Sequence, residues 1–311
     1  MRPRLSLLAV CVVVVFTTST QADFLMIPDS GNDRVGIYSA ADGSLVDANF
    51  IDIAAAAASV GYAGGLTPIE ALEVNGEVWV TDQVADRIWR FDTSGNFIAD
   101  LAVGQIDNAR GFEVVGDTVY IAQGATADQP EGIVTLDVPS LTLTGSFASA
   151  PAGDINYFDV EFYNGELFVP NIDTGNDGIE RFNLAGTFLG FFAQSDGVTD
   201  FDFLQQLAPR SSNGNLLAGG FSPPSGVYEF QSDGTPLGIT AGLDFGPRGV
   251  YELGNGDVLW TNGTWVRTDA DIRDSGGQYR YITPTTIPEP ATLLLLAMGG
   301  FAMIRRRNPQ S

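Results

Sequence analysis

The sequence has 311 residues, and its 15 basic residues are all arginines, against 38 acidic residues and no histidine, so the net charge is −23. Without histidine or lysine, and with one cysteine at position 11, the chain has no serine–histidine–aspartate triad, no histidine or thiolate metal site and no lysine Schiff base. Any chemistry must use carboxylates, tyrosine, arginine, hydroxyl groups or a hard metal held by oxygen atoms.

Residues 1–22 have the pattern of a secretory signal peptide. Arg2 and Arg4 precede the apolar run Leu5–Phe16, and Thr20-Gln21-Ala22 is a suitable cleavage site. We therefore expect an exported chain that starts at Asp23. An uncleaved N-terminal anchor is the alternative, and the apolar run is short for one.

The body between the two chain ends is strongly acidic and has no cysteine. Without the five terminal arginines and Glu289 it has ten arginines against 37 acidic residues, a net charge near −27. Such a surface repels nucleic acid and anionic lipid and attracts divalent cations.

A repeated unit runs through this body, and its clearest copy is Ile69–Ile98. The unit reads as four strands with alternating apolar residues, separated by turns. Five central turns contain a glycine at spacings of 40, 49, 49 and 42 residues: Gly76, Gly116, Gly165, Gly214 and Gly256. Repeats of roughly 40–50 residues with four strands are typical of β-propeller blades. A β-sandwich is the alternative, but it does not explain the even spacing.

The N-terminal segment Phe24–Tyr38 matches the unit from its second strand onward. We therefore expect a first blade built from both chain ends, with Gln278–Thr283 as the closing strand. With five complete units this predicts an all-β propeller of six four-stranded blades over residues 23–284; five or seven blades are the alternatives.

The phrases Asp29–Val35 and Asp82–Ile88 both contain an aspartate at a strand end, followed by an Asp-Arg pair. In this they resemble the NHL-type propellers and the related six-bladed SMP-30/gluconolactonase-like group. The resemblance covers the first two units closely and the others in outline. It implies a divalent metal held in the channel by carboxylate and amide oxygens, although those relatives often also use a histidine.

Polar residues are predicted to gather at one mouth of the channel, where first strands begin and second strands end. The predicted ligand-binding set is Asp29, Asp82, Gln123, Asn171, Asn262, Arg110 and Arg248. The predicted calcium ligands are Glu70, Asp82, Asn171 and Asp159. Two interpretations stay open: a calcium-type site with the arginines orienting an anion, or carboxylates that cap turns and balance nearby arginines. The tryptophans Trp79, Trp89, Trp260 and Trp265 fit sugar binding or, more commonly, packing between blades.

The C-terminal segment 285–311 contains a Pro-Glu-Pro turn, an apolar run and an arginine cluster. The run Ala291–Ile304 has no charged side chain; its 14 residues would form a helix about 21 Å long. That is short for a bilayer, and the following arginines predict a cytoplasmic C-terminus. A plain membrane anchor is one interpretation.

The order of these parts resembles the PEP-CTERM sorting signal of exported bacterial proteins. The resemblance implies that Pro288, Glu289 and Pro290 are recognised by exosortase, a membrane-embedded protease, and that Arg305, Arg306 and Arg307 end the anchor. It implies an inner-membrane stage followed by release towards the cell surface or extracellular matrix of a Gram-negative-type bacterium. We expect a non-enzymatic protein that binds exopolysaccharide or surface proteins. A divalent-metal-dependent hydrolase or lactonase with its site at the propeller mouth is the alternative.

Overall fold

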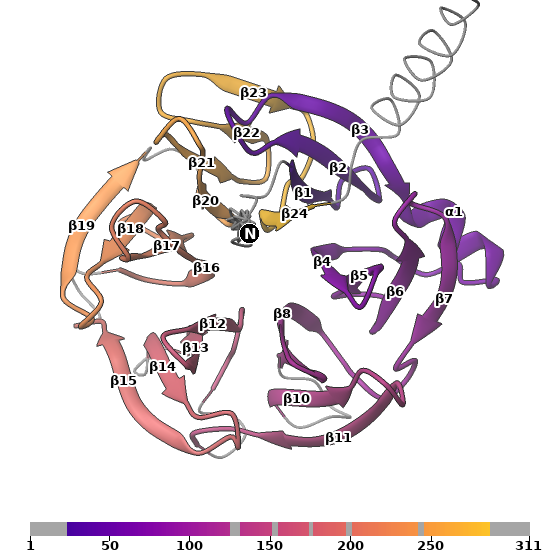
Figure 1. Ribbon diagram of the computed structural model, residues 1–311, viewed down its shortest axis with the longest axis horizontal. Helices are drawn as coiled ribbons and strands as arrows, with labels where there is room; N and C mark the ends of the chain where they lie inside the picture. The colour runs from indigo at the N-terminus through magenta and orange to yellow at the C-terminus, as the bar shows by residue number, and fades with distance from the viewer. Residues whose placement is uncertain are drawn as a thin grey trace, which may run out of the picture.

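The computed structural model describes residues 24–124, 131–150, 155–173, 177–196, 201–241 and 246–286. They form six four-stranded antiparallel sheets arranged in a ring, which Figure 1 shows along the ring axis. The prediction of a propeller with six four-stranded blades is confirmed. The expected signal peptide and the sorting residues Pro288–Pro290 and Arg305–Arg307 lie outside the described residues.

The four strands of each blade follow one another from the ring axis to the rim. In the order of blades 1 to 6, the innermost strands are β24 (Thr283–Thr285), β4 (Pro68–Val74), β8 (Ala109–Val115), β12 (Glu161–Tyr163), β16 (Leu204–Pro209) and β20 (Val250–Glu252). The second strands are β1 (Phe24–Asp29), β5 (Glu77–Asp82), β9 (Thr118–Gln123), β13 (Glu166–Asn171), β17 (Leu216–Gly220) and β21 (Val258–Thr261). The third strands are β2 (Arg34–Ser39), β6 (Arg87–Asp92), β10 (Gly132–Asp137), β14 (Gly178–Phe182), β18 (Gly226–Phe230) and β22 (Trp265–Arg267). The outermost strands are β3 (Leu45–Asp52), β7 (Phe97–Leu101), β11 (Thr142–Phe147), β15 (Phe188–Gln194), β19 (Pro236–Ala241) and β23 (Ile272–Ser275).

The turns between innermost and second strands show why the repeat carries a glycine there. Asn75 and Gly76 both have positive φ, 50° and 80°, and Asn164 and Gly165 repeat this with 51° and 85°. Two consecutive positive φ angles are the geometry of a type I′ hairpin turn, for which Asn-Gly is the favoured pair.

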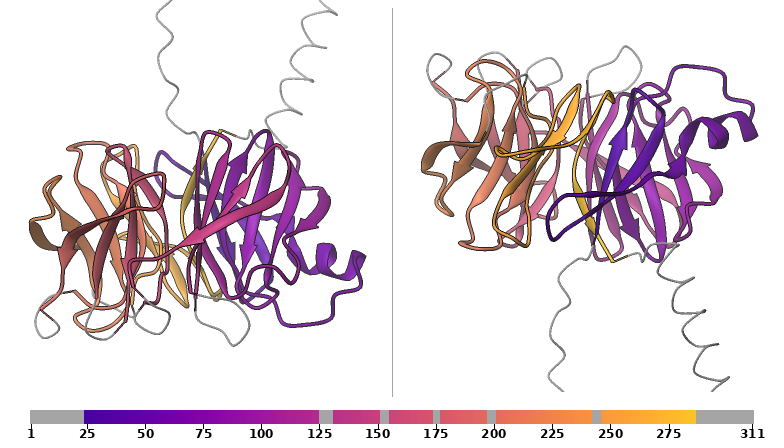
Figure 2. Two further views of the ribbon diagram at one scale, coloured as in Figure 1. Left: turned by 90° about the horizontal axis from the view of Figure 1, so that it is seen from below. Right: turned by 90° about the horizontal axis from the view of Figure 1, so that it is seen from above.

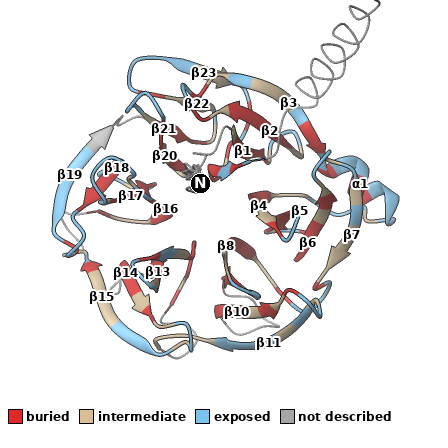
Figure 3. Cartoon of the chain, viewed as in Figure 1, coloured by how far each residue is buried: buried red, intermediate tan, exposed pale blue. Residues whose placement is uncertain are grey.

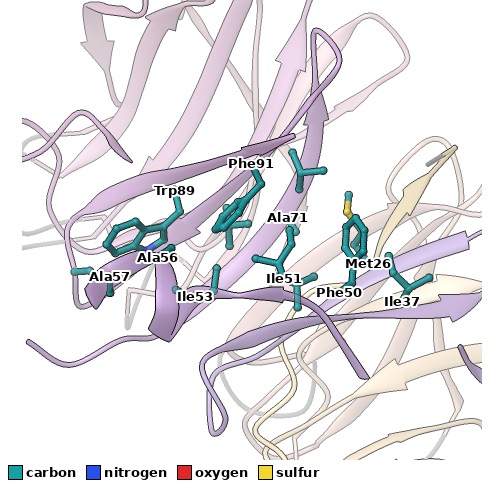
Figure 4. Close-up of a cluster of buried hydrophobic side chains, with 14 residues drawn as sticks. Met26, Ile37, Phe50, Ile51, Ile53, Ala56, Ala57, Ala71, Trp89 and Phe91 are labelled. Atoms are coloured by element: carbon teal, nitrogen blue, oxygen red, sulfur yellow. The ribbon is translucent and has the colours of Figure 1, made fainter. Parts of the chain in front are cut away.

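The core lies between blades, so both faces of the second and third strands are buried, whereas the outermost strands face solvent (Figure 3). Figure 4 shows the cluster between blades 1 and 2, in which Met26 lies beside Phe50 at one end and Trp89 lies at the other. A short helix, α1 (Ile53–Ser59), covers this cluster after β3. Trp79, Trp89 and Trp260 are buried, as packing between blades requires.

The ring is closed by pairing of the C-terminal strand β24 with the N-terminal strand β1. Phe24 lies opposite Thr285, and Met26 lies opposite Thr283. The closing strand shares only Thr283 with the predicted segment Gln278–Thr283. The residues before it divide their bonds between blades: the Arg280 N–H donates to the Pro28 carbonyl of β1 at 2.9 Å, whereas the Tyr281 N–H donates to the Ile69 carbonyl of blade 2 at 3.2 Å.

The ring has two faces, between which the strands run (Figure 2). We call the face where innermost strands begin the arginine face, after Arg110 and Arg248, which directly precede or open these strands. The opposite face, where innermost strands end, is called the tail face, because β24 ends there and residue 286 leads on to the sorting segment. Among the described residues, no helix is both long and apolar enough to span a bilayer.

Candidate functional site

Three of the innermost strands, β4, β8 and β16, begin irregularly near the central channel. A shift in pairing register, such as those of β4, β8 and β16, frees backbone N–H groups and re-aims side chains. The shifts lie between Pro68 and Glu70, between Ala109 and Phe112, and between Leu204 and Leu207.

Buried carboxylates accept the freed N–H groups and connect blades across the channel wall. Glu70 of blade 2 accepts from the Phe112 N–H at 2.7 Å, and its other oxygen accepts from the Thr283 hydroxyl at 3.1 Å. Asp159 of blade 4 accepts from the Leu207 N–H at 2.8 Å. Buried charge is tolerated where such hydrogen bonds satisfy it.

Gln206 of blade 5 has the same role with a neutral side chain. Its Oε1 accepts from the N–H groups of Val250 and Ile282, each at 2.9 Å, and its Nε2 donates to the Ile282 carbonyl at 2.8 Å. We call Glu70, Asp159 and Gln206 the channel belt. Together these three side chains join blades 1, 2, 3, 4, 5 and 6 around the axis.

The acidic groups near the belt hold protons more tightly than usual. Burial raises the pKa of Glu70 well above its ordinary value, and the nearby Asp159 raises it further. Burial also raises the pKa of Asp159 to about 7, although its backbone hydrogen bonds lower it. Burial, and then the charge of Glu113, raise the pKa of Glu161. The channel therefore prefers protonated or cation-neutralised carboxyl groups.

A cavity of about 530 Å³ opens from the belt towards the tail face and is lined by all six innermost strands or their flanks. Four acidic side chains line it, Glu70, Glu73, Glu113 and Glu161, among apolar residues such as Leu72 and Val160. This cavity is separate from the mouth at which the sequence predicted a site, because that mouth lies on the arginine face.

Tyr281 lies between the cavity and the arginine face. Its ring is 1 % exposed, and its hydroxyl donates to the Phe158 carbonyl at 2.9 Å. Tyr281 therefore links two blades: its backbone N–H bonds to Ile69 of blade 2, and its hydroxyl bonds to Phe158, which precedes blade 4. Its hydroxyl is close enough to Arg110 and Arg248 for both to lower its pKa, but burial is the larger effect and raises the pKa well above its usual range.

Two arginines and three aromatic rings form a continuous arc on the arginine face. The Arg110 guanidinium lies 3.8 Å from the centre of the Phe158 ring, and that of Arg248 lies 5.2 Å from the Phe221 ring. Phe203 connects the two ends: its ring centre is 5.0 Å from that of Phe158 and 5.3 Å from that of Phe221. We call these five residues the arginine–phenylalanine arc. The arc runs from the start of blade 3, past blades 4 and 5, to the start of blade 6.

Phe203, in the middle of the arc, has a backbone conformation that large residues rarely adopt. Its φ is 49°, in the left-handed region, and its ring is half-buried. A bulky residue in this region indicates strain, and strain concentrates at functional sites. The observation therefore adds to the case for the arc as a site.

The polar residues at the ends of the second strands lie on the same face, where they hold turns. The Asp82 Oδ1 accepts from the N–H groups of Thr67, Val84 and Ala85 at 2.8–3.2 Å, and its Oδ2 accepts from the Trp89 indole at 3.1 Å.

The equivalent residues of four other blades repeat this role. In each, a side-chain oxygen accepts from a backbone N–H group. The acceptors are Asp29, Gln123, Asn171 and Asn262, and their donors are, in the same order, Gln278, Asp107, Asn156 and Thr264. These residues fix the loops that lead into or leave the strands, which is how capping side chains act in turns.

Four residues carry the predicted calcium site, and the structure separates them into two groups. Glu70 and Asp159 lie in the channel belt, whereas Asp82 and Asn171 hold turns at the strand ends. Within the described parts of the chain, no three acidic side chains come together as metal ligands. The predicted mouth residues Arg110 and Arg248 are the two that converge on the channel.

Sequence reasoning missed the phenylalanines of the arc and the role of the glycine after each arginine. Arg110-Gly111 and Arg248-Gly249 occupy equivalent positions in blades 3 and 6. A Cβ on Gly111 would lie 2.9 Å from the Asp159 Cα, and one on Gly249 would lie 2.5 Å from the Arg280 carbonyl oxygen. The repeated Arg-Gly pair is the signal that could have marked this site.

Comparison with known proteins gives one family match and many structural relatives. The family described as the PEP-CTERM protein-sorting motif matches residues 286–307. No curated protein sequence matches the chain.

Solved propellers are similar in fold. A chain of a nidogen/laminin complex is 14 % identical with a TM-score of 0.64, and the match covers 85 % of this chain and 98 % of that one. A protein of unknown function from Bacteroides caccae is 12 % identical with a TM-score of 0.57, over 84 % and 98 % of the two chains. At such identities the likeness concerns the fold alone. The chain is an exported six-bladed β-propeller, which carries a PEP-CTERM motif for sorting by exosortase.

Proposed function

We propose that this protein is a non-enzymatic binding protein of the cell surface or extracellular matrix, which holds exopolysaccharide on its arginine face. The observation that carries the proposal is the arginine–phenylalanine arc. Phe158, Phe203 and Phe221 are half-buried, so each presents part of its ring on this face. Aromatic rings stack on the apolar faces of sugars, and buried cations beside them add hydrogen bonds.

The position of the chain ends supports this assignment. Phe24 and Thr285 are paired neighbours, so both ends of the propeller lie on the tail face. While the sorting segment anchors the protein, the tail face is therefore next to the membrane and the arginine face points away from it. A ligand in the matrix meets the arc first.

The test is binding of the exported chain, residues 23–311 in mild detergent, to exopolysaccharide of the producing cells. We expect Phe203→Ala to weaken binding at least about fivefold, since a central aromatic contact contributes more than ~1 kcal/mol. The matched control is Phe188→Ala, because Phe188 is 39 % exposed on β15 at the rim of the ring. Microscale thermophoresis measures both. Equal affinity of the two variants, or no binding by the unaltered chain, contradicts the proposal.

A second candidate is the metal-dependent hydrolase or lactonase. Its support is the repulsion between Glu70 and Asp159, which a divalent cation in the channel would relieve. The binding proposal predicts that calcium and magnesium raise the melting temperature equally, through screening of the acidic surface. The hydrolase predicts a calcium-specific rise that Glu70→Gln removes, together with lactonase activity. Substitution of Asp82 or Asn171 is a weaker test, because it also opens a turn.

A further inference from the structure

We propose that the ligand of the arginine face is anionic, and that Arg110 and Arg248 bind a carboxylate or sulfate group of an acidic sugar. This inference rests on the proposed function and names the chemistry of its ligand. Three observations carry it: the burial of Arg110 without a charged partner, the unpartnered nitrogens of Arg248, and the contrast with the other arginines of the body.

Arg110 is 5 % exposed and bonds only to neutral groups among the described residues. Its Nη1 donates to the Asn156 side-chain oxygen at 2.6 Å and to the Tyr157 carbonyl at 2.7 Å. Its Nε is buried and has no hydrogen-bond partner there. Burial lowers the pKa of Arg110 and is the larger effect, whereas the charge of Glu131 raises it. A buried cation that hydrogen-bonds only to neutral groups is costly, because neutral dipoles replace only part of its lost hydration.

Arg248 approaches the channel from blade 6, on the opposite side of the ring from blade 3 (Figure 1). Its Nε and Nη1 are buried and without hydrogen-bond partners in the described parts of the chain. Burial lowers the pKa of Arg248, and it lowers the pKa of Arg110 to about 10. Anionic groups of a ligand bound at these guanidinium groups would supply the missing acceptors and stabilise the charged form of each.

Other arginines of the body show that acidic partners are abundant. Six of them form ion pairs at 2.6–3.4 Å: Arg34, Arg87, Arg90, Arg181, Arg210 and Arg273. In a body with a net charge near −27, Arg110 and Arg248 form no ion pair among the described residues, and neither do Arg267 and Arg280. What distinguishes Arg110 and Arg248 from these two is that each also has buried nitrogens without a hydrogen-bond partner in the described parts of the chain.

The chemistry of these donors selects the ligand. A guanidinium forms paired hydrogen bonds with planar carboxylates and with sulfate or phosphate oxygens. The phenylalanine rings between the two arginines suit the apolar face of a sugar ring. The acidic body repels polyanions elsewhere, so binding is confined to this face. Uronate and sulfated sugars share the required anionic group, and the experiment distinguishes them.

The test compares galacturonate oligomers with the same oligomers after methyl esterification, which removes the charge and keeps the sugar. Calorimetry on the chain of residues 23–311 is expected to show at least about tenfold tighter binding of the acid form, as charged hydrogen bonds imply. Arg248→Gln is expected to remove this preference. Arg248 is half-buried, so the variant retains the fold; Arg181→Gln, which breaks the ion pair with Glu166, is the matched control.

Sulfated dextran oligomers form the second arm. If the unaltered chain binds the sulfated sugar and Arg248→Gln does not, the anion site is supported and sulfate is identified as its ligand. If the chain binds the uronate instead, carboxylate is identified as the ligand. Equal affinity for acid and ester, or an Arg248→Gln variant that keeps the preference, overturns the inference. Either result leaves the proposed function standing if the producer's exopolysaccharide still binds in a Phe203-dependent way.

Discussion

Truncation after Arg280 is expected to prevent the ring from closing and to abolish the cooperative unfolding transition. The lost segment includes Tyr281 and Ile282, each 1 % exposed, and strand β24 with its pairing to β1. Burial of two large side chains contributes about 2–3 kcal/mol each. Loss of the belt bonds to Ile282 and Thr283 adds to this, so the total is a large part of the ~5–15 kcal/mol that stabilises a domain. Far-UV circular dichroism during heating measures the transition.

Truncation after Thr286 is the matched control and is expected to unfold like the intact chain. It keeps β24 and the contact of Thr286 with Glu73, whose carboxylate accepts from the Thr286 N–H at 2.8 Å. If the chain that stops after Arg280 melts at the same temperature as the one that stops after Thr286, strand β24 does not close the ring.

The residues that close the ring end before the Pro-Glu-Pro turn of the sorting motif. Thr286, the last of the described residues, is bonded to the body, and in the sequence one residue, Ile287, separates it from Pro288. A cut at the Pro-Glu-Pro turn therefore leaves the closing strand and its partners intact. We therefore expect a propeller cut at this turn to keep the complete ring, with a free energy of unfolding that does not depend on the residues after the cut.

Local sequence pattern predicted the blades because the signals lie within each repeat. Alternating strands and Asn-Gly turns act over a few residues, so Asn75-Gly76 and Asn164-Gly165 could be recognised without knowledge of the rest of the chain. The end of each second strand, such as Asp29 or Asp82, could be placed for the same reason.

The contacts that make up the channel belt and the arginine–phenylalanine arc could not be predicted in this way, although Glu70, Asp159, Arg110 and Arg248 were predicted as site residues. The belt and the arc both depend on contacts between blades, for instance Glu70 with the Phe112 N–H, 42 residues away in sequence. The register shifts that expose these groups are single-residue irregularities and leave no clear pattern. Phe203 is an ordinary apolar residue in the sequence, and its positive φ appears only in the fold.

Raising the pH from about 5 to 8 is expected to destabilise the protein, and the buried Asp159 is one source of this effect. Its pKa is about 7 in the folded ring against an ordinary 3.8. Between these values the folded state binds more protons than the unfolded chain, so stability falls as pH rises through the folded pKa. From pH 5 to the folded pKa is about two pH units, which corresponds to about 3 kcal/mol at ~1.36 kcal/mol per unit. Burial raises the pKa of Glu70, Glu113 and Glu161 in the same direction.

Asp159→Asn isolates this contribution, because asparagine keeps an oxygen acceptor for the Leu207 N–H but does not ionise. The variant is expected to gain stability over the unaltered protein as the pH rises from 5 to 8, so that its own slope in this range is smaller. The matched control is Asp137→Asn, which removes the same charge from an exposed turn whose hydrogen bonds with Ser140 lower the carboxyl pKa. Chemical denaturation at several pH values measures the free energy of unfolding. A slope in Asp159→Asn as steep as in Asp137→Asn would show that Asp159 titrates normally in the folded ring.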